Sequence, residues 1–247
     1  MATPKIFTTE LPYYEEPFPA SGFEEANVYD LPLFPYANLP IASVRYRVVK
    51  PLMDLLIVFL VLPIALPLGL IIAALVKLTS RGSVLYRHRR IGQYLHPIHV
   101  WKFRTMYSDS DHVLEQYLDA NPEAREEWTH THKLKRDPRI TPVGQLLRKT
   151  SLDEIPQLLN VLAGEMSVVG PRPIVNEERV KYGSHFRTYC YALPGITGLW
   201  QVSGRNNVGY PERVQMDVRY VERWSLWMEL KILFKTIFVI FHREGAY

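Results

Sequence analysis

Residues 55–76 read LLIVFLVLPIALPLGLIIAALV, a stretch in which no side chain carries a charge. As a straight helix this stretch would measure about 33 Å, enough to cross a hydrocarbon core of roughly 30 Å. Its length alone therefore predicts a helix that spans a membrane.

Two prolines in the stretch favour a different path. Pro63 and Pro67 lie near its middle, and each removes a helical hydrogen bond and crowds the preceding turn, at a cost of about 3 kcal/mol. The part before the first proline, Leu55–Leu62, is about 12 Å long as a helix and reaches roughly the bilayer midplane. We expect the helix to break at these prolines.

Basic residues flank both ends of the stretch, whereas a spanning helix normally has an asymmetric flank. A segment that dips into the membrane and returns to the same leaflet needs basic residues on both sides. We therefore predict that residues 45–81 form a re-entrant helix–break–helix with both ends in the cytoplasm, with a single spanning helix as the alternative. The basic residues are Arg45, Arg47 and Lys50 before the stretch and Lys77, Arg81, Arg87, Arg89 and Arg90 after it.

Charge is divided unevenly along the rest of the chain. Residues 1–44 hold seven prolines and a net charge of −5, whereas the remainder carries +9. This composition predicts an extended or disordered acidic tail, without the basic start of a signal peptide. The single cysteine, Cys190, excludes an intramolecular disulfide and fits a reducing compartment. Mean hydropathy close to zero excludes a polytopic membrane protein.

Residues 224–247 predict a second membrane contact. Apolar side chains recur there at helical spacing, Lys231 and Lys235 lie elsewhere on the wheel, and His242 and Arg243 follow. This pattern is typical of an amphipathic interfacial helix with a basic side, and a buried core helix is the alternative. The apolar positions are Leu226, Leu230, Leu233, Phe234, Ile237 and Phe241.

Between these segments, residues 82–223 predict a cytoplasmic body of mixed short elements. Val84–Ile91 and Pro97–Met106 are strand-like and are joined by a short turn, so we expect a hairpin. Asp109–Asp119 and Pro122–Lys133 read as helices. The chain is therefore predicted to be mainly α with a small β element. In the second strand, Lys102 and Arg104 fall on one face.

The most informative stretch of the body is residues 148–173, RKTSLDEIPQLLNVLAGEMSVVGPRP. Ile155, Leu158, Leu159 and Leu162 follow the helical period. Pro156 is tolerated only in a first turn, so we expect the helix to begin at about Asp153. One interpretation is that Asp153 caps this helix and that Glu154 pairs with an arginine.

A chemical interpretation accounts for the same residues. Two acids stand among bases: Arg148 precedes them and Arg172 follows them, while Lys102 and Arg104 come from the strand. One carboxylate can attack a phosphoryl group while the other holds a divalent cation, and the bases supply the positive charge that the transition state needs. Mg²⁺ is the expected cation, with Asp153 and Glu154 as its candidate ligands.

From about Ser43 onward, the chain resembles the bacterial sugar transferase family, the monotopic phosphoglycosyl transferases. It is most similar to the exopolysaccharide-priming branch, the undecaprenyl-phosphate galactose or glucose phosphotransferases. The stretches that carry the resemblance are the proline-broken apolar segment, KFRTM (102–106), DPRITPVG (137–144), residues 148–173, PGITGLWQVSGR (194–205) and the ending GAY (245–247).

The resemblance implies transfer of a hexose-1-phosphate from a UDP-hexose to undecaprenyl phosphate, with UMP as the second product. It implies that Asp153 is the nucleophile that forms an aspartyl-phosphosugar intermediate and that Glu154 binds Mg²⁺. Lys102, Arg148, Arg172 and Arg205 then contact phosphate or substrate. It also implies the bacterial inner membrane, a catalytic body on the cytoplasmic face and a homodimer. Many members of this branch carry additional N-terminal transmembrane helices, whereas this chain has only the acidic tail, so we expect a catalytic unit alone.

A non-catalytic scaffold at the membrane surface is the competing class. It would explain the two membrane contacts and the basic body, but not the pair Asp153–Glu154 among bases. No nucleic-acid partner is expected, because the chain has no basic helix with stacking aromatic residues and no recognised nucleic-acid-binding motif.

Overall fold

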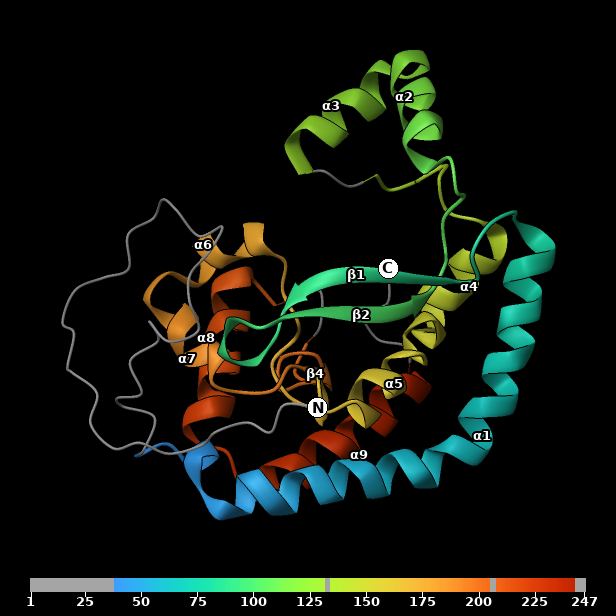
Figure 1. The fold of residues 1–247 in the computed structure, drawn as a ribbon. Helices are drawn as coiled ribbons and strands as arrows, with labels where there is room; N and C mark the ends of the chain where they lie inside the picture. The colour runs from blue at the N-terminus through green and yellow to red at the C-terminus, as the bar shows by residue number, and fades with distance from the viewer. Residues whose placement is uncertain (1–37, 132–133, 205–207, 243–247) are drawn as a thin grey trace.

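The computed structural model describes residues 38–131, 134–204 and 208–242. This part of the chain is mainly helical, as predicted, and contains two small sheets (Figure 1). The helices are α1 (Lys50–Thr79), α2 (Ser110–Ala120), α3 (Pro122–Thr131), α4 (Pro142–Thr150), α5 (Gln157–Leu162), α6 (Arg179–Tyr182), α7 (Phe186–Cys190), α8 (Tyr210–Glu222) and α9 (Leu226–His242). The strands are β1 (Leu85–Ile91), β2 (Pro97–Phe103), β3 (Ser167–Val169) and β4 (Gly195–Thr197).

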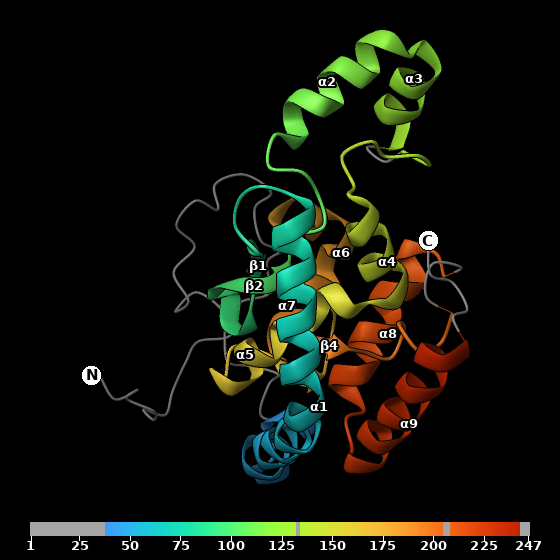
Figure 2. The same ribbon diagram turned by 90° about the vertical axis from the view of Figure 1, so that its right-hand side faces the viewer.

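The predicted hairpin is confirmed as the antiparallel pair β1–β2, in which Leu85 is opposite Phe103 and Ile91 is opposite Pro97. One end of this hairpin packs with α1 and α4, and Ile91 at the other end packs with α7 and α8. The second sheet, parallel β3–β4, is not predicted from the sequence. The helical pair α2–α3 is confirmed and projects away from the body in both views (Figures 1 and 2).

Helix α1 is a single helix that bends near its middle, where Pro63 and Pro67 fall (Figure 1). The expected break is therefore a bend without an interruption of the helix, as is typical of proline kinks. The two arms pack on the same body at different places. Val58 of the first arm is buried with Ile232 of α9, and Val76 of the second arm is buried with Leu147 of α4 and Phe103 of β2.

The outer side of α1 is exposed and apolar. In the part of the chain that the structure describes, it belongs to the one helix long and apolar enough to cross a membrane, and only 17% of its most apolar window is buried. An exposed apolar surface of this length is typical of contact with lipid. The exposed side chains include Leu52, Leu56, Phe59, Leu60, Ile64, Leu66, Leu70, Ile71 and Leu78.

Helix α9 has features of both alternatives predicted for it, the interfacial helix and the buried core helix. One side is buried, with Glu229 and Ile232 inside the protein, and the other side exposes apolar residues. Several of the positions predicted to form one apolar stripe thus lie on the outer side, at the same end of the molecule as the first arm of α1 (Figures 1 and 2). The exposed residues are Trp227, Leu230, Phe234, Ile237 and Phe238.

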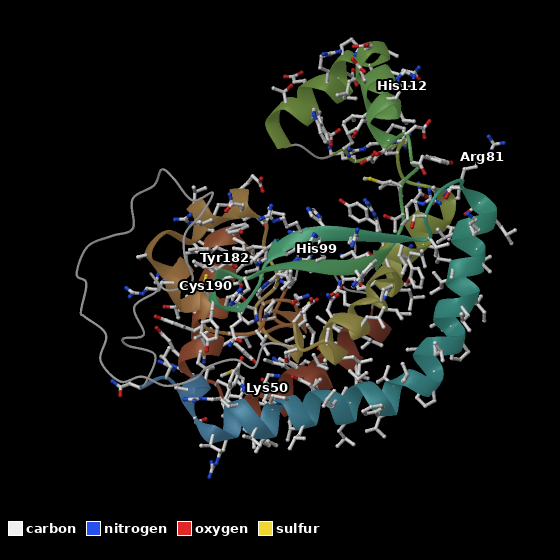
Figure 3. All side chains as sticks on the ribbon, viewed as in Figure 1. Lys50, Arg81, His99, His112, Tyr182 and Cys190 are labelled. Atoms are coloured by element: carbon white, nitrogen blue, oxygen red, sulfur yellow. The ribbon has the colours of Figure 1, made fainter. Side chains whose placement is uncertain are left out.

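A buried ion cluster joins α1 to α9. Lys50, of which only 1% is exposed (Figure 3), donates to Glu229 Oε2 at 2.9 Å and to Asp54 Oδ1 at 3.2 Å. The other acceptor oxygens are also paired, because Ser167 Oγ donates to Asp54 Oδ2 at 2.7 Å and Trp224 Nε1 donates to Glu229 Oε1 at 2.7 Å. The cluster therefore fixes the first arm of α1 to both α9 and β3.

Replacing Lys50→Met should leave two buried carboxylates without their cation. We expect the free energy of unfolding to fall by about 3–5 kcal/mol, measured by chemical denaturation in detergent micelles. Lys235→Met, which removes an exposed lysine from α9, is the matched control and should have little effect. Equal effects of the two substitutions would contradict a stabilising role for the cluster.

Candidate active site

Asp153 and Glu154 lie in a single 3₁₀ turn, Leu152–Glu154, between α4 and α5. The chain enters this turn through Ser151, whose φ of 57° is left-handed. The expected start of the helix at about Asp153 is wrong, because α5 begins at Gln157. Pro156 has no N–H to donate, so the α-helical hydrogen-bond pattern is established only after it.

The buried side of α5 is not the side that carries most of its leucines. Leu159 and Leu162, assigned to the apolar side, are exposed, whereas Asn160 and Val161 are buried. Asn160 accepts from the N–H of Trp101 at 3.0 Å and donates to the His99 carbonyl at 2.8 Å. It therefore joins α5 to β2. Its only signal in the sequence is an amide within an otherwise apolar helical run.

Lys102 of β2 binds both acids of the turn. Its Nζ lies 2.6 Å from Glu154 Oε1 and 3.6 Å from Asp153 Oδ2. Arg172, from the loop after β3, places Nη1 3.9 Å from the same Glu154 oxygen. Four of the residues singled out in the sequence thus come together, although they belong to three separate parts of the chain.

The two neighbouring carboxyl groups have opposite pKa shifts. Burial raises the pKa of Asp153 above its usual range, and the charges of Lys102 and Arg148 only partly offset this. Burial alone would also raise the pKa of Glu154, but Lys102 and Arg172, with hydrogen bonds from Lys102 and Gln157, lower it. Paired acids with divergent pKa values are typical of catalytic sites with two distinct roles.

Arg148 reaches the site from the last turn of α4, where its charge acts on Asp153. Its Nε donates to Thr105 Oγ1 at 2.8 Å. Helix α4 packs very closely on this threonine, because a Cβ added to Gly144 would lie 2.1 Å from the Thr105 carbonyl oxygen. Glycine at position 144 thus allows the approach that orients Arg148.

The loop that carries Arg172 is held in place by hydrogen bonds to the buried hydroxyl group of Tyr189. Tyr189 donates its hydroxyl to the Arg172 carbonyl at 3.0 Å and accepts the N–H of Ile174 at 3.2 Å. Beside it, Tyr182 (Figure 3) donates to Asp217 Oδ2 at 2.7 Å. Burial raises the pKa of Asp217 to about 8, against the lowering effects of Tyr182 and Arg172.

The site lies against the second arm of α1. Leu152 and Ile155, which flank the two acids, pack with Ile72 and Val76. A Cβ added to Gly69 of α1 would lie 3.9 Å from Ile155. The acids are thus next to the long apolar helix, where an enzyme acting on a membrane-bound substrate would need them.

One predicted substrate-binding residue, Arg104, is not part of this arrangement. Arg104 lies just beyond β2, and its guanidinium donates to the Ser80 carbonyl at 2.9 Å and to Ser80 Oγ at 3.0 Å. It therefore ties the end of α1 to the hairpin, and this geometry does not support a role in substrate binding. Arg205 lies outside the described residues.

The donor set fits a weakly coordinated divalent cation. Among the described residues, no group of three or more His, Cys, Asp or Glu side chains could hold a metal ion. Mg²⁺ commonly uses one or two carboxylates and takes its other ligands from water and substrate phosphates. Asp153 and Glu154 could therefore supply all the protein ligands that Mg²⁺ needs, provided that Lys102 Nζ moves away from Glu154 Oε1 when the ion binds.

The site and its position define a class of enzyme: a transferase that acts on phosphorylated substrates beside an apolar surface. Comparison with known proteins is consistent with this class. The bacterial sugar transferase family matches residues 45–243, and the chain belongs to that family.

Three relatives illustrate the match. The chain is 54% identical to the exopolysaccharide production protein ExoY of Rhizobium meliloti, over 73% of this chain and 80% of that protein. It is 48% identical to an undecaprenyl-phosphate galactose phosphotransferase of Salmonella typhimurium, over 81% of this chain and 42% of that protein. It is 37% identical to a UDP-glucose:undecaprenyl-phosphate glucose-1-phosphate transferase of Escherichia coli, over 92% of this chain and 47% of that protein. The match thus spans less than half of the latter two proteins.

Replacing Thr105→Val should remove the acceptor that orients Arg148 and leave the shape of the side chain unchanged. We expect the turnover number of the transferase to fall about tenfold or more, in line with a lost hydrogen bond to a charged group. Thr150→Val removes an exposed hydroxyl hydrogen bond of the same helix and is the control. Equal turnover numbers for the two variants would contradict the orienting role of Thr105.

The raised pKa of Asp217 predicts how stability depends on pH. The folded protein keeps this proton up to pH about 8, whereas the unfolded chain releases it near pH 4. Raising the pH from 5 to 7 should therefore destabilise the wild type relative to Asp217→Asn by about 1.4 kcal/mol per pH unit. Urea unfolding of both proteins at several pH values measures this difference, and parallel curves would contradict it.

Proposed function

We propose that this protein transfers a hexose-1-phosphate from a UDP-hexose to undecaprenyl phosphate, in the first membrane step of exopolysaccharide or surface glycan synthesis. The products are undecaprenyl-diphosphate sugar and UMP. The observation that carries the proposal is Asp153, a buried carboxyl group among Lys102, Arg148 and Glu154 beside the apolar helix. The names of the relatives supply the substrate classes.

The transfer takes place in two displacements at Asp153. A carboxylate oxygen of Asp153 first attacks the phosphorus that carries the sugar, and the bond from that phosphorus to the bridging oxygen breaks, so that UMP leaves. A phosphate oxygen of the lipid then attacks the same phosphorus and releases Asp153. The raised pKa of Asp153 supports this role, because a more basic carboxylate is a better nucleophile.

Glu154 has the complementary role. Its lowered pKa keeps it ionised, which suits a ligand for Mg²⁺ more than a nucleophile. Bound Mg²⁺ would neutralise charge on the phosphate oxygens of the donor. Lys102 and Arg172 already converge on Glu154, and they supply positive charge for the phosphoryl group in the transition state.

The arrangement of α1 supports a re-entrant membrane segment. Its start is held by the pair Lys50–Glu229, and Ser80, just after its end, is held by Arg104. Both ends therefore contact one body, which would lie on one side of the membrane. We place that body on the cytoplasmic face of the bacterial inner membrane, where nucleotide sugars are found. The homodimer stays a prediction.

A panel of UDP-sugars tests the reaction and identifies the donor in the same experiment. Each sugar is incubated with the protein, undecaprenyl phosphate and Mg²⁺, and the released UMP is measured. Release with one or two hexoses is expected. No release from any sugar would favour the scaffold alternative.

Asp153→Asn should reduce UMP release by roughly 10³-fold or more and abolish the labelled phosphosugar adduct on the protein, because an amide cannot serve as the nucleophile. Glu154→Gln should lower the rate and raise the Mg²⁺ concentration needed for half-maximal activity. Asp119→Asn, at an exposed site on α2, is the control. An adduct recovered on Asp153→Asn would show that another residue is the nucleophile.

A further inference from the structure

One face of the β1–β2 hairpin extends the site beyond the residues described above. In the antiparallel register Tyr86 is opposite Lys102, and the next residues on the same face are His88 and Arg90. Arg89, which pairs with His99 (labelled in Figure 3), falls on the other face because side chains alternate along a strand. His88 and Arg90 therefore continue the face that presents Lys102 to the two acids.

His88 is a neutral hydrogen-bond donor in this setting. Arg90 Nη2 lies 3.2 Å from His88 Nδ1, and since a guanidinium can only donate, Nδ1 accepts and Nε2 carries the ring proton. Burial lowers the pKa of His88, and the charges of Arg90 and Lys102 lower it further. The imidazole thus has one N–H available to a ligand and no charge of its own.

Arg90 and Arg172 are two cations on segments that are hydrogen-bonded to each other, because the N–H of Ile91 donates to the Ile174 carbonyl at 2.9 Å. Burial lowers the pKa of Arg90, and the charge of Arg172 adds to this effect. The side chain of Arg90 is 18% exposed, and its nearest carboxylate, Glu178, is 3.6 Å away. That carboxylate also accepts the N–H of Val175 at 3.1 Å and a hydrogen bond from Tyr210. Within the part of the chain that the structure describes, the positive charge of this pair is therefore only partly compensated.

We propose that Arg90, His88 and Arg172 bind the phosphate of the departing nucleoside monophosphate, as the leaving-group half of the donor site. This inference rests on the function proposed above. The Arg172 side chain lies 3.9 Å from Glu154, and its loop is hydrogen-bonded to β1 next to Arg90, where the N–H of Ile91 donates to the Ile174 carbonyl at 2.9 Å. Arg172 is therefore placed between the reacting phosphate and the departing one.

The chemistry of the first displacement requires such a group. When Asp153 attacks, the bond between the sugar-bearing phosphorus and the bridging oxygen breaks, and its electron pair passes to that oxygen on the nucleotide phosphate. A guanidinium can bind two oxygens of this phosphate at once, and the His88 N–H adds a third donor. These donors stabilise the negative charge where it develops.

The proposal predicts different effects of losing Arg90 on the two displacements. The nucleotide takes part only in the first, so loss of Arg90 should weaken UMP binding and slow formation of the adduct. It should leave unchanged the rate at which an already formed phosphosugar adduct is discharged to undecaprenyl phosphate. A residue needed only for folding would affect both displacements.

The test compares Arg90→Gln with Arg89→Gln, which removes the same charge from the exposed face of the same strand. UMP binding is measured by calorimetry, and exchange of labelled UMP into the UDP-sugar is measured without lipid. Arg90→Gln should raise the Kd for UMP about tenfold or more, whereas Arg89→Gln should not change it. Should Arg90→Gln fail to fold, His88→Ala should raise the Kd at least about twofold.

The outcomes distinguish the two proposals. Equal Kd values for UMP in wild type, Arg90→Gln and His88→Ala would overturn the leaving-group site, even if the wild type transfers sugar phosphate. Slower discharge of the preformed adduct in Arg90→Gln would also overturn it. UMP binding that depends on Arg90 in a protein that releases no UMP from any donor would support the nucleotide site and overturn the proposed function.

Discussion

The contact between Lys102 Nζ and Glu154 Oε1, at 2.6 Å, is the interaction on which the site depends. It joins the β1–β2 hairpin to the turn that carries both acids, and Arg172 reaches the same oxygen from a third segment. Burial raises the pKa of Asp153, an effect that Lys102 only partly offsets, whereas Lys102 and Arg172 together lower the pKa of Glu154. The two neighbouring carboxyl groups thus differ in chemistry.

The site and the apolar helix are parts of one packed unit. Phe103, the neighbour of Lys102, and Ile155, the neighbour of Glu154, both pack in the cluster that contains Ile72 and Val76 of α1. The bend in α1 lets its first arm join α9 while its second arm supports the acids. Movement of the second arm would therefore be transmitted directly to the turn that carries Asp153 and Glu154.

The sequence predicts the local elements and the charged residues well, since both follow from short-range patterns. The hairpin, α2–α3, α9 and the convergence of Lys102 and Arg172 on the acids were expected. The three-residue strands β3 and β4 are too short for a periodic signal. The buried role of Asn160 and the exposure of Leu159 depend on β2, which is distant in sequence, and the contacts of Arg104 depend on where α1 ends.

The ion pair between Lys50 and Glu229 joins residues that are 179 positions apart. During synthesis the lysine therefore emerges from the ribosome long before its partner, together with the apolar stretch that follows it. Until α9 has been made, Lys50 lacks its partner Glu229, and the first arm of α1 lacks the helix on which it packs. Docking of the first arm of α1 onto α9 can therefore be completed only after α9 has been translated.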